Sequence, residues 1–194
     1  MDNKRRYTFI ALSVAILFVI YVVVTYNSLI RKDEKVKLQW NEVQNTYQRR
    51  LELVPQLVGV VKGGANFEQT TLQKIAEARA KAAGVSVNSI SANSYQEQTA
   101  VQDELADAAN RLVITIENYP NLKGTKAFIG LQVELEGTER RIKVARKDFN
   151  DAIAVYNSSV RSFPAKIVAG TFGFKPKDGF QANSGADTSV EIKF

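Results

Sequence analysis

The sequence of 194 residues contains no histidine and no cysteine. Their absence excludes an imidazole base, a cysteine nucleophile, a disulfide and an ordinary zinc site, because these need a neutral imidazole or a thiolate. Any catalysis would have to use carboxylates, serine, threonine, lysine or tyrosine. The lack of cysteine does not indicate a cellular compartment, since a reducing cytosol and an oxidising periplasm both tolerate it.

Charge is also absent, from Tyr7 to Ile30. Residues 7–26 are mostly apolar, and as a helix they would extend roughly 30 Å, the thickness of a bilayer's hydrocarbon core. Cations flank this stretch on both sides, and Tyr7 and Tyr26 stand at its ends, where aromatic rings favour the headgroup regions. We predict a short basic N-terminus over residues 1–6 and a transmembrane helix over residues 7–26.

A cleaved secretory signal is the alternative, but it would have a shorter apolar core and a small residue on each side of the cleavage site. Val24-Thr25-Tyr26-Asn27 is a poor cleavage site, so we interpret the span as an uncleaved signal anchor. The dense cluster Lys4-Arg5-Arg6 favours a cytoplasmic N-terminus. The sequence thus predicts a single-pass inner-membrane protein whose residues 31–194 lie outside the cytoplasm.

Beyond the span, apolar residues recur at spacings of three and four, which is typical of helices. The first stripe extends from Val36 to Val61 and should end at Gly63-Gly64. Pro55 lies inside it and cannot donate to the carbonyl of Leu51, so we expect a kink or a restarted helix there.

Three further segments show the helical spacing. A second helix is expected over residues 66–83, followed by a loop over 85–93. A capping box, Ser94 to Glu97, should open a third helix that Pro120 ends. The last helix has apolar positions from Phe128 to Phe163, which Pro164 closes.

We therefore predict an all-α fold, in which the transmembrane helix is followed by an antiparallel four-helix bundle. The bundle domain would comprise residues 27–174. Residues 175–194 are rich in glycine, polar residues and lysine, and we expect a flexible tail there.

Several segments resemble the LemA family in their residues and order. They are Tyr26-Asn27-Ser28-Leu29-Ile30, Trp40, Arg49 to Val58, Glu77-Ala78-Arg79-Ala80, Glu117 to Lys123, Leu135 to Ile142, Tyr156-Asn157, Phe163-Pro164 and Gly173-Phe174. The resemblance implies a bacterial membrane protein with one N-terminal span and an antiparallel helical-bundle domain. It also implies partnership with membrane proteases or other small envelope proteins.

The cluster Arg49, Arg50 and Glu52 beside Pro55 has two interpretations. It could be an anion or partner site at an irregular part of the bundle, or it could form ion pairs with Glu117 or Glu139 on neighbouring helices. Both remain open from the sequence.

The other candidate positions are also explained by structural roles. Glu139, Arg140 and the nearby cations alternate with acids at helical spacing, which favours a solvated face over a site for nucleic acid. Tyr119 and Pro120 mark a helix end and a tight connection, with partner contact as the alternative. Tyr156 lies in the apolar seam and Asn157 flanks it, where an asparagine could set the register by a buried hydrogen bond.

We found no arrangement that favours catalysis, a metal or a cofactor. Glu136 and Glu139 share a helix face, but Arg140 lies four residues after Glu136 and favours a salt bridge. A serine and lysine pair such as Ser162 and Lys166 lacks the strand, turn and helix that hold a nucleophile.

The charge distribution supports a role at the membrane. Residues 1–37 carry seven cations and three acids, whereas residues 38–194 carry nineteen cations and seventeen acids. Most of the excess positive charge therefore flanks the span. We predict a membrane-anchored, non-catalytic interaction or scaffold protein of the cell envelope, whose partners are the lipid bilayer and other envelope proteins or a second copy, with no nucleic acid. The alternative is an envelope sensor that binds an anionic ligand near Pro55.

Overall fold

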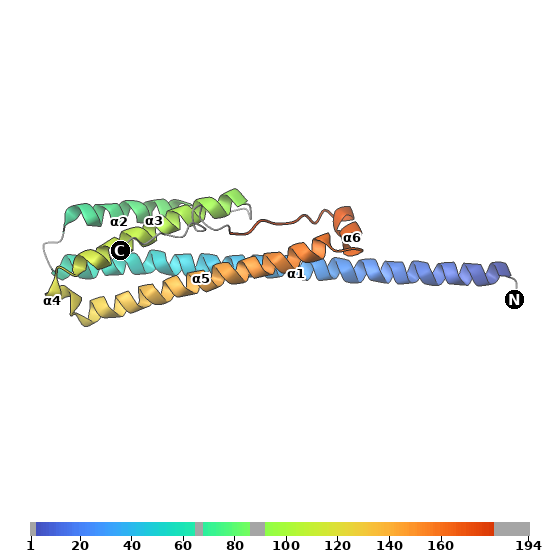
Figure 1. Ribbon diagram of the computed structural model, residues 1–194, viewed down its shortest axis with the longest axis horizontal. Helices are drawn as coiled ribbons and strands as arrows, with labels where there is room; N and C mark the ends of the chain where they lie inside the picture. Colours follow the sequence, from blue (N-terminus) through green and yellow to red (C-terminus); the bar gives the residue numbers. More distant parts are fainter. Residues whose placement is uncertain (1–2, 65–67, 86–91, 181–194) are drawn as a thin grey trace, which may run out of the picture. The chain divides into compact units, whose positions relative to one another are not determined.

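The computed structural model describes residues 3–64, 68–85 and 92–180. These residues form helices and connecting segments, with no strand among them. The helices of the described chain, in order, are α1 (Asn3–Gly64), α2 (Gln69–Gly84), α3 (Ala92–Ile116), α4 (Pro120–Lys123), α5 (Lys126–Arg161) and α6 (Ala165–Thr171) (Figure 1). The predicted all-α class and the long apolar N-terminal helix are therefore confirmed. The count of four bundle helices and their antiparallel order stay predictions.

The chain forms two compact units. The first comprises residues 1–41 and 148–177, and the second comprises residues 42–147 and 178–194. Helices α1 and α5 each contribute one part to each unit. We describe the units separately.

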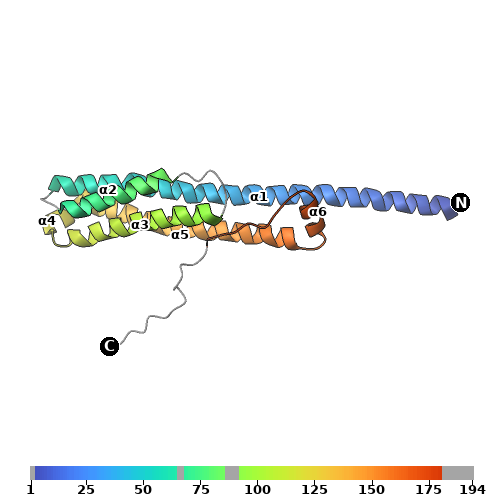
Figure 2. The ribbon, with the colours of Figure 1, turned by 90° about the horizontal axis from the view of Figure 1, so that it is seen from above.

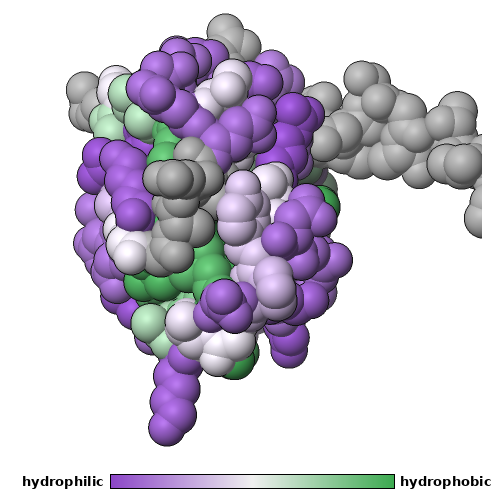
Figure 3. Space-filling view, turned by 90° about the vertical axis from the view of Figure 1, so that its left-hand side faces the viewer, coloured by the Kyte–Doolittle hydropathy of each residue, from purple (hydrophilic) through white to green (hydrophobic). Residues whose placement is uncertain are grey.

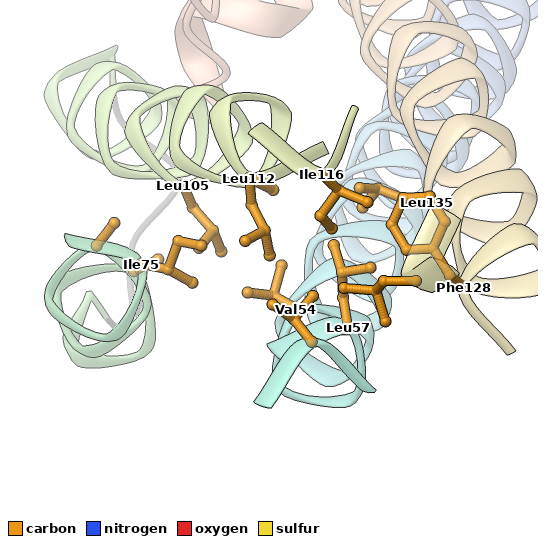
Figure 4. Packing of buried hydrophobic residues seen from close by; sticks show 13 residues of the cluster. Val54, Leu57, Ile75, Leu105, Leu112, Ile116, Phe128 and Leu135 are labelled. Carbon is orange, nitrogen blue, oxygen red and sulfur yellow. The ribbon is translucent and has the colours of Figure 1, made fainter. Parts of the chain in front are cut away.

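The second unit has a continuous apolar core. Side chains from α1, α2, α3, α4 and α5 point toward one another there, as Figure 4 shows for the labelled residues. The buried members are Val54, Leu57, Val61, Ile75, Ala78, Ala82, Leu105, Ala109, Leu112, Ile116, Leu122, Phe128 and Leu135. Removing this much apolar surface from water is the main force that holds the helices of this unit together.

In the first unit, buried residues come from α1, α5 and α6. The rings of Trp40 and Phe149 lie 5.3 Å apart between centroids. The other buried apolar residues are Leu29, Val36, Ile153, Tyr156, Val160, Val168 and Ala169. Both ribbon views show α6 beside α1 (Figures 1 and 2). Helix α6 is thus packed beside α1 and does not extend away from it.

Two predicted helix boundaries differ from the structure. Helix α1 continues through Pro55 to Gly64 and does not restart there. Helix α3 begins at Ala92, so Ser94 lies inside its first turn and the predicted capping box is wrong. A helix tolerates serine in its first turn because the backbone N–H groups there have no intrahelical acceptor. The predicted start of the second helix, at residues 66 and 67, lies outside the described residues.

The end of the last predicted helix also differs. Helix α5 ends at Arg161, and Phe163 is 83% exposed instead of lying in the buried seam. Helix α6 follows Pro164 and was not predicted. It has only seven residues, too few to show a helical period.

Part of the expected tail makes defined contacts. The Lys177 ammonium lies 2.7 Å from the Asp33 carboxylate in the first unit. The Phe180 ring lies 5.8 Å from the Tyr95 ring in the second. The remainder of the expected tail, residues 181–194, lies outside the described residues.

Candidate functional site

The N-terminal part of α1 exposes its apolar side chains on all sides. Tyr7 is 70% exposed and Leu17 is 65% exposed, and neighbouring large apolar residues are similar. By length and composition, α1 is the one helix of the described chain that could cross a membrane. Tyr26, the predicted end of the span, differs because its ring packs against Phe172 and Phe174, at 4.9 and 5.7 Å between centroids.

Just beyond the span, polar contacts join α1, α5 and the segment after α6. The Asn157 side chain donates to the carbonyl of Lys177 at 2.7 Å and accepts from its N–H at 2.8 Å. The Lys177 ammonium pairs with Asp33 and lies 5.4 Å from the centre of the Tyr156 ring. Asn157 therefore holds the segment after α6 against α5.

The ionisation of Asp33 reflects these contacts. Burial alone would raise the pKa of Asp33, but hydrogen bonds from Lys177 and Lys37 outweigh it and lower that pKa. The folded state thus stabilises the charged carboxylate.

The structure brings together a serine and a lysine, but not the predicted pair. Lys32 Nζ donates to Ser159 Oγ, and Ser159 Oγ donates to the carbonyl of Val155 at 2.9 Å. Ser162 Oγ likewise donates to the carbonyl of Ser158 at 2.6 Å. Ser159 Oγ is therefore bonded both to Lys32 and to a backbone carbonyl of its own helix.

Arg50 lies at the centre of a buried ion pair in the second unit. Its side chain is 1% exposed, and its guanidinium bonds both carboxylate oxygens of Glu139, at 2.8 and 2.5 Å. It also donates to the backbone carbonyl of Gln102 at 2.8 Å. The intramolecular interpretation with Glu139 is confirmed for Arg50. The buried cation that an anionic ligand would need is already bonded to the protein.

The neighbouring candidates lie at the surface. Arg49 bonds Glu134 at 2.6 Å and lies 3.8 Å from Glu52, and all three side chains are about half exposed. Such exposed pairs contribute little to stability. Pro55 is exposed within α1.

The remaining candidates have local partners. Glu117 pairs with Lys123 at 3.1 Å, and Arg140 lies 3.9 Å from Glu136, the expected i, i+4 pair. Pro120 is the first residue of α4, with Tyr119 before it, so this motif forms a connection as expected. Figure 3 shows mostly hydrophilic side chains around a smaller hydrophobic area at the α4 end of the molecule.

Sequence reasoning missed a cluster around Arg146 in the second unit. Its guanidinium donates to the Tyr47 hydroxyl at 2.9 Å and to Asp103 at 3.0 Å, and lies 5.4 Å from the centre of the Phe180 ring. Burial alone would lower the pKa of Arg146, but Tyr47 and Asp103 raise it. Phe180 was the available signal, because it is an aromatic residue in a mostly polar tail.

A groove of about 800 Å³ lies between α2 and α3 in the second unit. Small side chains, Ala78, Ala100 and Ala108, line part of it. The charged residues that line it are five acids, Glu68, Glu77, Asp103, Glu104 and Asp107, and two cations, Lys74 and Arg111. The small side chains allow a bound molecule to approach the helix backbones closely, and the acids give the groove negative charge.

Within the described residues, no group of three or more acidic side chains is placed to hold a metal ion. The arrangement of the chain defines a class: helical proteins with one apolar helix of membrane-spanning length and a packed helical part. Residues 39–194 match the model of the LemA family. The chain belongs to this family, as the resemblance of its motifs predicted.

Two curated relatives illustrate how far the similarity extends. Protein LemA of Metamycoplasma hominis is 26% identical over 161 residues, which cover 83% of this chain and 70% of that protein. Magnetosome protein MamQ 2 of Paramagnetospirillum magneticum is 30% identical over 84 residues, which cover 43% of this chain and 31% of that protein.

Proposed function

We propose that this chain is a single-pass inner-membrane protein of the bacterial cell envelope that acts as a non-catalytic interaction or scaffold protein. The observation that carries the proposal is the change of burial along α1. Most of its apolar side chains before Val24 are exposed, whereas Leu29, Val36 and most later members of the stripe are buried. A helix that is apolar on every side needs an apolar surrounding, and a bilayer supplies one.

The proposed orientation places the N-terminus inside and the helical domain outside the cytoplasm. Lys4-Arg5-Arg6 directly precedes the span and supports this direction. A reporter active only outside the cytoplasm, fused to the C-terminus, should be active, and a cytoplasmic reporter should not. The reverse pattern would overturn the orientation.

The proposed mechanism is tethering. Anchoring confines the helical domain to the membrane, which raises the effective concentration of a weak partner in the same membrane. The similarity to magnetosome protein MamQ 2 covers less than half of this chain, so we do not transfer a role in magnetosomes.

The groove between α2 and α3 is the surface we propose for the partner. Asp103 and Glu104 pair with Arg146 and Lys81, so the remaining acids leave the groove a slight excess of negative charge. It therefore suits a segment that carries lysine or arginine from another envelope protein. The alanines along the groove allow a partner helix or extended segment to approach closely. We therefore propose a basic protein segment as the occupant of the groove.

Crosslinking in the native membrane tests the surface. A photoreactive residue at Ala100, in the groove, should form an adduct with another envelope protein. The same residue at Val144, an apolar position of α5 that is 57% exposed, is the matched control and should not. Substituting Glu104 and Asp107 with lysine should remove the adduct formed from Ala100, because the change reverses the charge at the groove.

The other outcomes discriminate between partners. Equal adducts from both positions would overturn the assignment of the surface. Adducts that join only two copies of this chain would replace the adaptor role with a homo-oligomeric scaffold. An adduct with a membrane protease would identify that class of partner.

A further inference from the structure

The segment from Phe163 to Phe172 exposes an unusual amount of apolar surface. Phe163 is 83% exposed, Ile167 is 60% exposed and Phe172 is 52% exposed. Scattered exposed apolar residues are common, but three large ones occur here within ten residues of the chain, and apolar surface so concentrated favours an apolar partner.

This apolar segment lies beside the end of the proposed span, within the first unit. The Tyr26 ring packs against the rings of Phe172 and Phe174. A cavity of about 310 Å³ is lined by Val24, Thr25, Ser28, Leu29 and Lys32 of α1, together with Ser159, Ser162 and Ala165. The start of α6 and the last turn of the span are therefore at the same level along α1, as Figures 1 and 2 show.

The charge of the surrounding segment fits a lipid surface. Residues 152–177 contain four cations and no acid. Lys177 pairs with Asp33, and the other three are Arg161, Lys166 and Lys175, all exposed. An apolar patch surrounded by cations is the pattern of segments that lie in the interface of an anionic membrane.

We propose that residues 163–172 are a second membrane contact, in which Phe163, Ile167 and Phe172 enter the boundary between headgroups and acyl chains. Such segments are buried by about 5–10 Å. The occupant is the leaflet in which the span ends. The inference rests on the proposed insertion of residues 7–26, because the span brings this patch to the bilayer. The contact would restrict the rotation and tilt in the bilayer of the first unit, which includes the span.

The absence of native cysteine makes a direct measurement possible in the full chain. A nitroxide is attached to a single cysteine at Phe163→Cys or Ile167→Cys, where the exposed side chain contributes little to the core. Val155→Cys is the matched control, since Val155 is an apolar residue of α5 in the same unit and is 56% exposed. Leu17→Cys places the nitroxide within the proposed span and reports whether the span lies among acyl chains. The chains are reconstituted at low protein density in vesicles of phosphatidylethanolamine and phosphatidylglycerol.

The readout is the ratio of collisions with oxygen, which concentrates among acyl chains, to collisions with a water-soluble nickel chelate. We expect a higher ratio at residues 163 and 167 than at residue 155. Adding Ile167→Glu to the chain labelled at residue 163 should shift its ratio toward that of residue 155, since a carboxylate disfavours burial among acyl chains. Because both positions are exposed, this change is not expected to unfold the domain.

Three results would overturn the inference, and they are distinguishable. Ratios at residues 163 and 167 equal to that at residue 155, with residue 17 among acyl chains, would reject the second contact alone. A water-exposed residue 17 would reject the span and the inference together. Shielding of residue 163 from both oxygen and nickel would show that protein covers the patch, and broadening between labels would identify that protein as a second copy.

Discussion

Two stretches of α1 differ in how their apolar residues are arranged. From Tyr7 to Val24 they occupy every side of the helix and are largely exposed, whereas from Leu29 to Val61 most of them follow one stripe that is buried or partly buried. Neighbouring helices can cover a stripe, but they would have to surround a helix that is apolar all round. The comparison shows that the pattern of apolar residues, more than their number, separates the proposed span from the part that packs in the protein.

The two stretches also differ in whether they contain charged residues. No charged residue occurs from Tyr7 to Ile30, but the later stretch buries Arg50 completely. Glu139 and the carbonyl of Gln102 compensate that buried cation. The packed part can hold a charge because it supplies specific partners, which lipid chains cannot.

Placing a charge in the packed stretch should have the largest effect. Leu57 is 2% exposed in the core of the second unit, so Leu57→Arg would bury a cation without a partner. We expect a loss of more than about 4 kcal/mol in the free energy of unfolding, enough to unfold the domain. Thermal unfolding followed by circular dichroism would measure it. Leu38→Arg, at a position of α1 that is 58% exposed, should be close to neutral.

Removing the buried cation Arg50 tests the packed stretch by the opposite change. Arg50→Leu leaves the carbonyl of Gln102 and the Glu139 carboxylate, which is 30% exposed, without their donor and should cost about 3 kcal/mol in the free energy of unfolding. Arg49→Leu breaks only an exposed pair and should cost less than about 1 kcal/mol. If Arg50→Leu were as mild as Arg49→Leu, the pair with Glu139 would not be a structural requirement. The double variant Arg50→Leu with Glu139→Leu should recover part of the loss.

The same type of substitution in the exposed stretch should act on insertion instead of folding. Leu17→Arg places a cation near the centre of the span, and we expect an insertion penalty of about 2.5–3.5 kcal/mol. The fraction of protein that resists extraction from membranes by alkaline carbonate would measure it. Tyr7→Arg, at the edge, should insert almost normally because the long side chain reaches the interface. A normal insertion of Leu17→Arg together with a destabilised domain would remove the distinction between the two stretches.

Asp33, near the start of the packed stretch, should give the smallest effect. Its pKa is lowered in the folded state, so its stabilisation is present above the usual aspartate pKa near 3.9 and is lost as the pH falls through the lowered folded-state value. We expect Asp33→Asn to cost at most about 1 kcal/mol at neutral pH. Its free energy of unfolding should also fall less steeply with acid than that of the wild type. Glu34→Gln, a change of an exposed neighbour, should cost less than Asp33→Asn at neutral pH.

The sequence predicted the helices well where an apolar period was long. The stripe in α1 and most of the seam in α5 are buried as expected, including Val36, Val61, Phe128 and Phe149. The pair between Arg50 and Glu139 was one of two interpretations, and only the contacts of the folded chain selected it. Arg50 and Glu139 both lie on helices, but their separation in the sequence does not predict how far apart they lie in space.

Other features depended on contacts that no local pattern encodes. Phe163 continues the apolar spacing of α5, yet the helix ends at Arg161 and the ring is exposed. Phe180 lies in a polar segment, yet its ring lies beside Arg146 and Tyr95. The exposure of Phe163 and the contacts of Phe180 both depend on where the chain turns.

The sequence by itself determined the all-α class, the apolar stretch that suits a membrane and the residues of the main buried stripes. These follow from local spacing and composition, since the side chains of one helix share a face at every third or fourth position. Only the tertiary structure decided which helix each stripe meets, that Arg50 pairs with Glu139, and that α6 lies beside the end of the proposed span with Ile167 exposed (Figures 1 and 2). The physical reason is that burial and pairing depend on distances between residues far apart in the chain, which the packing of the whole fold sets.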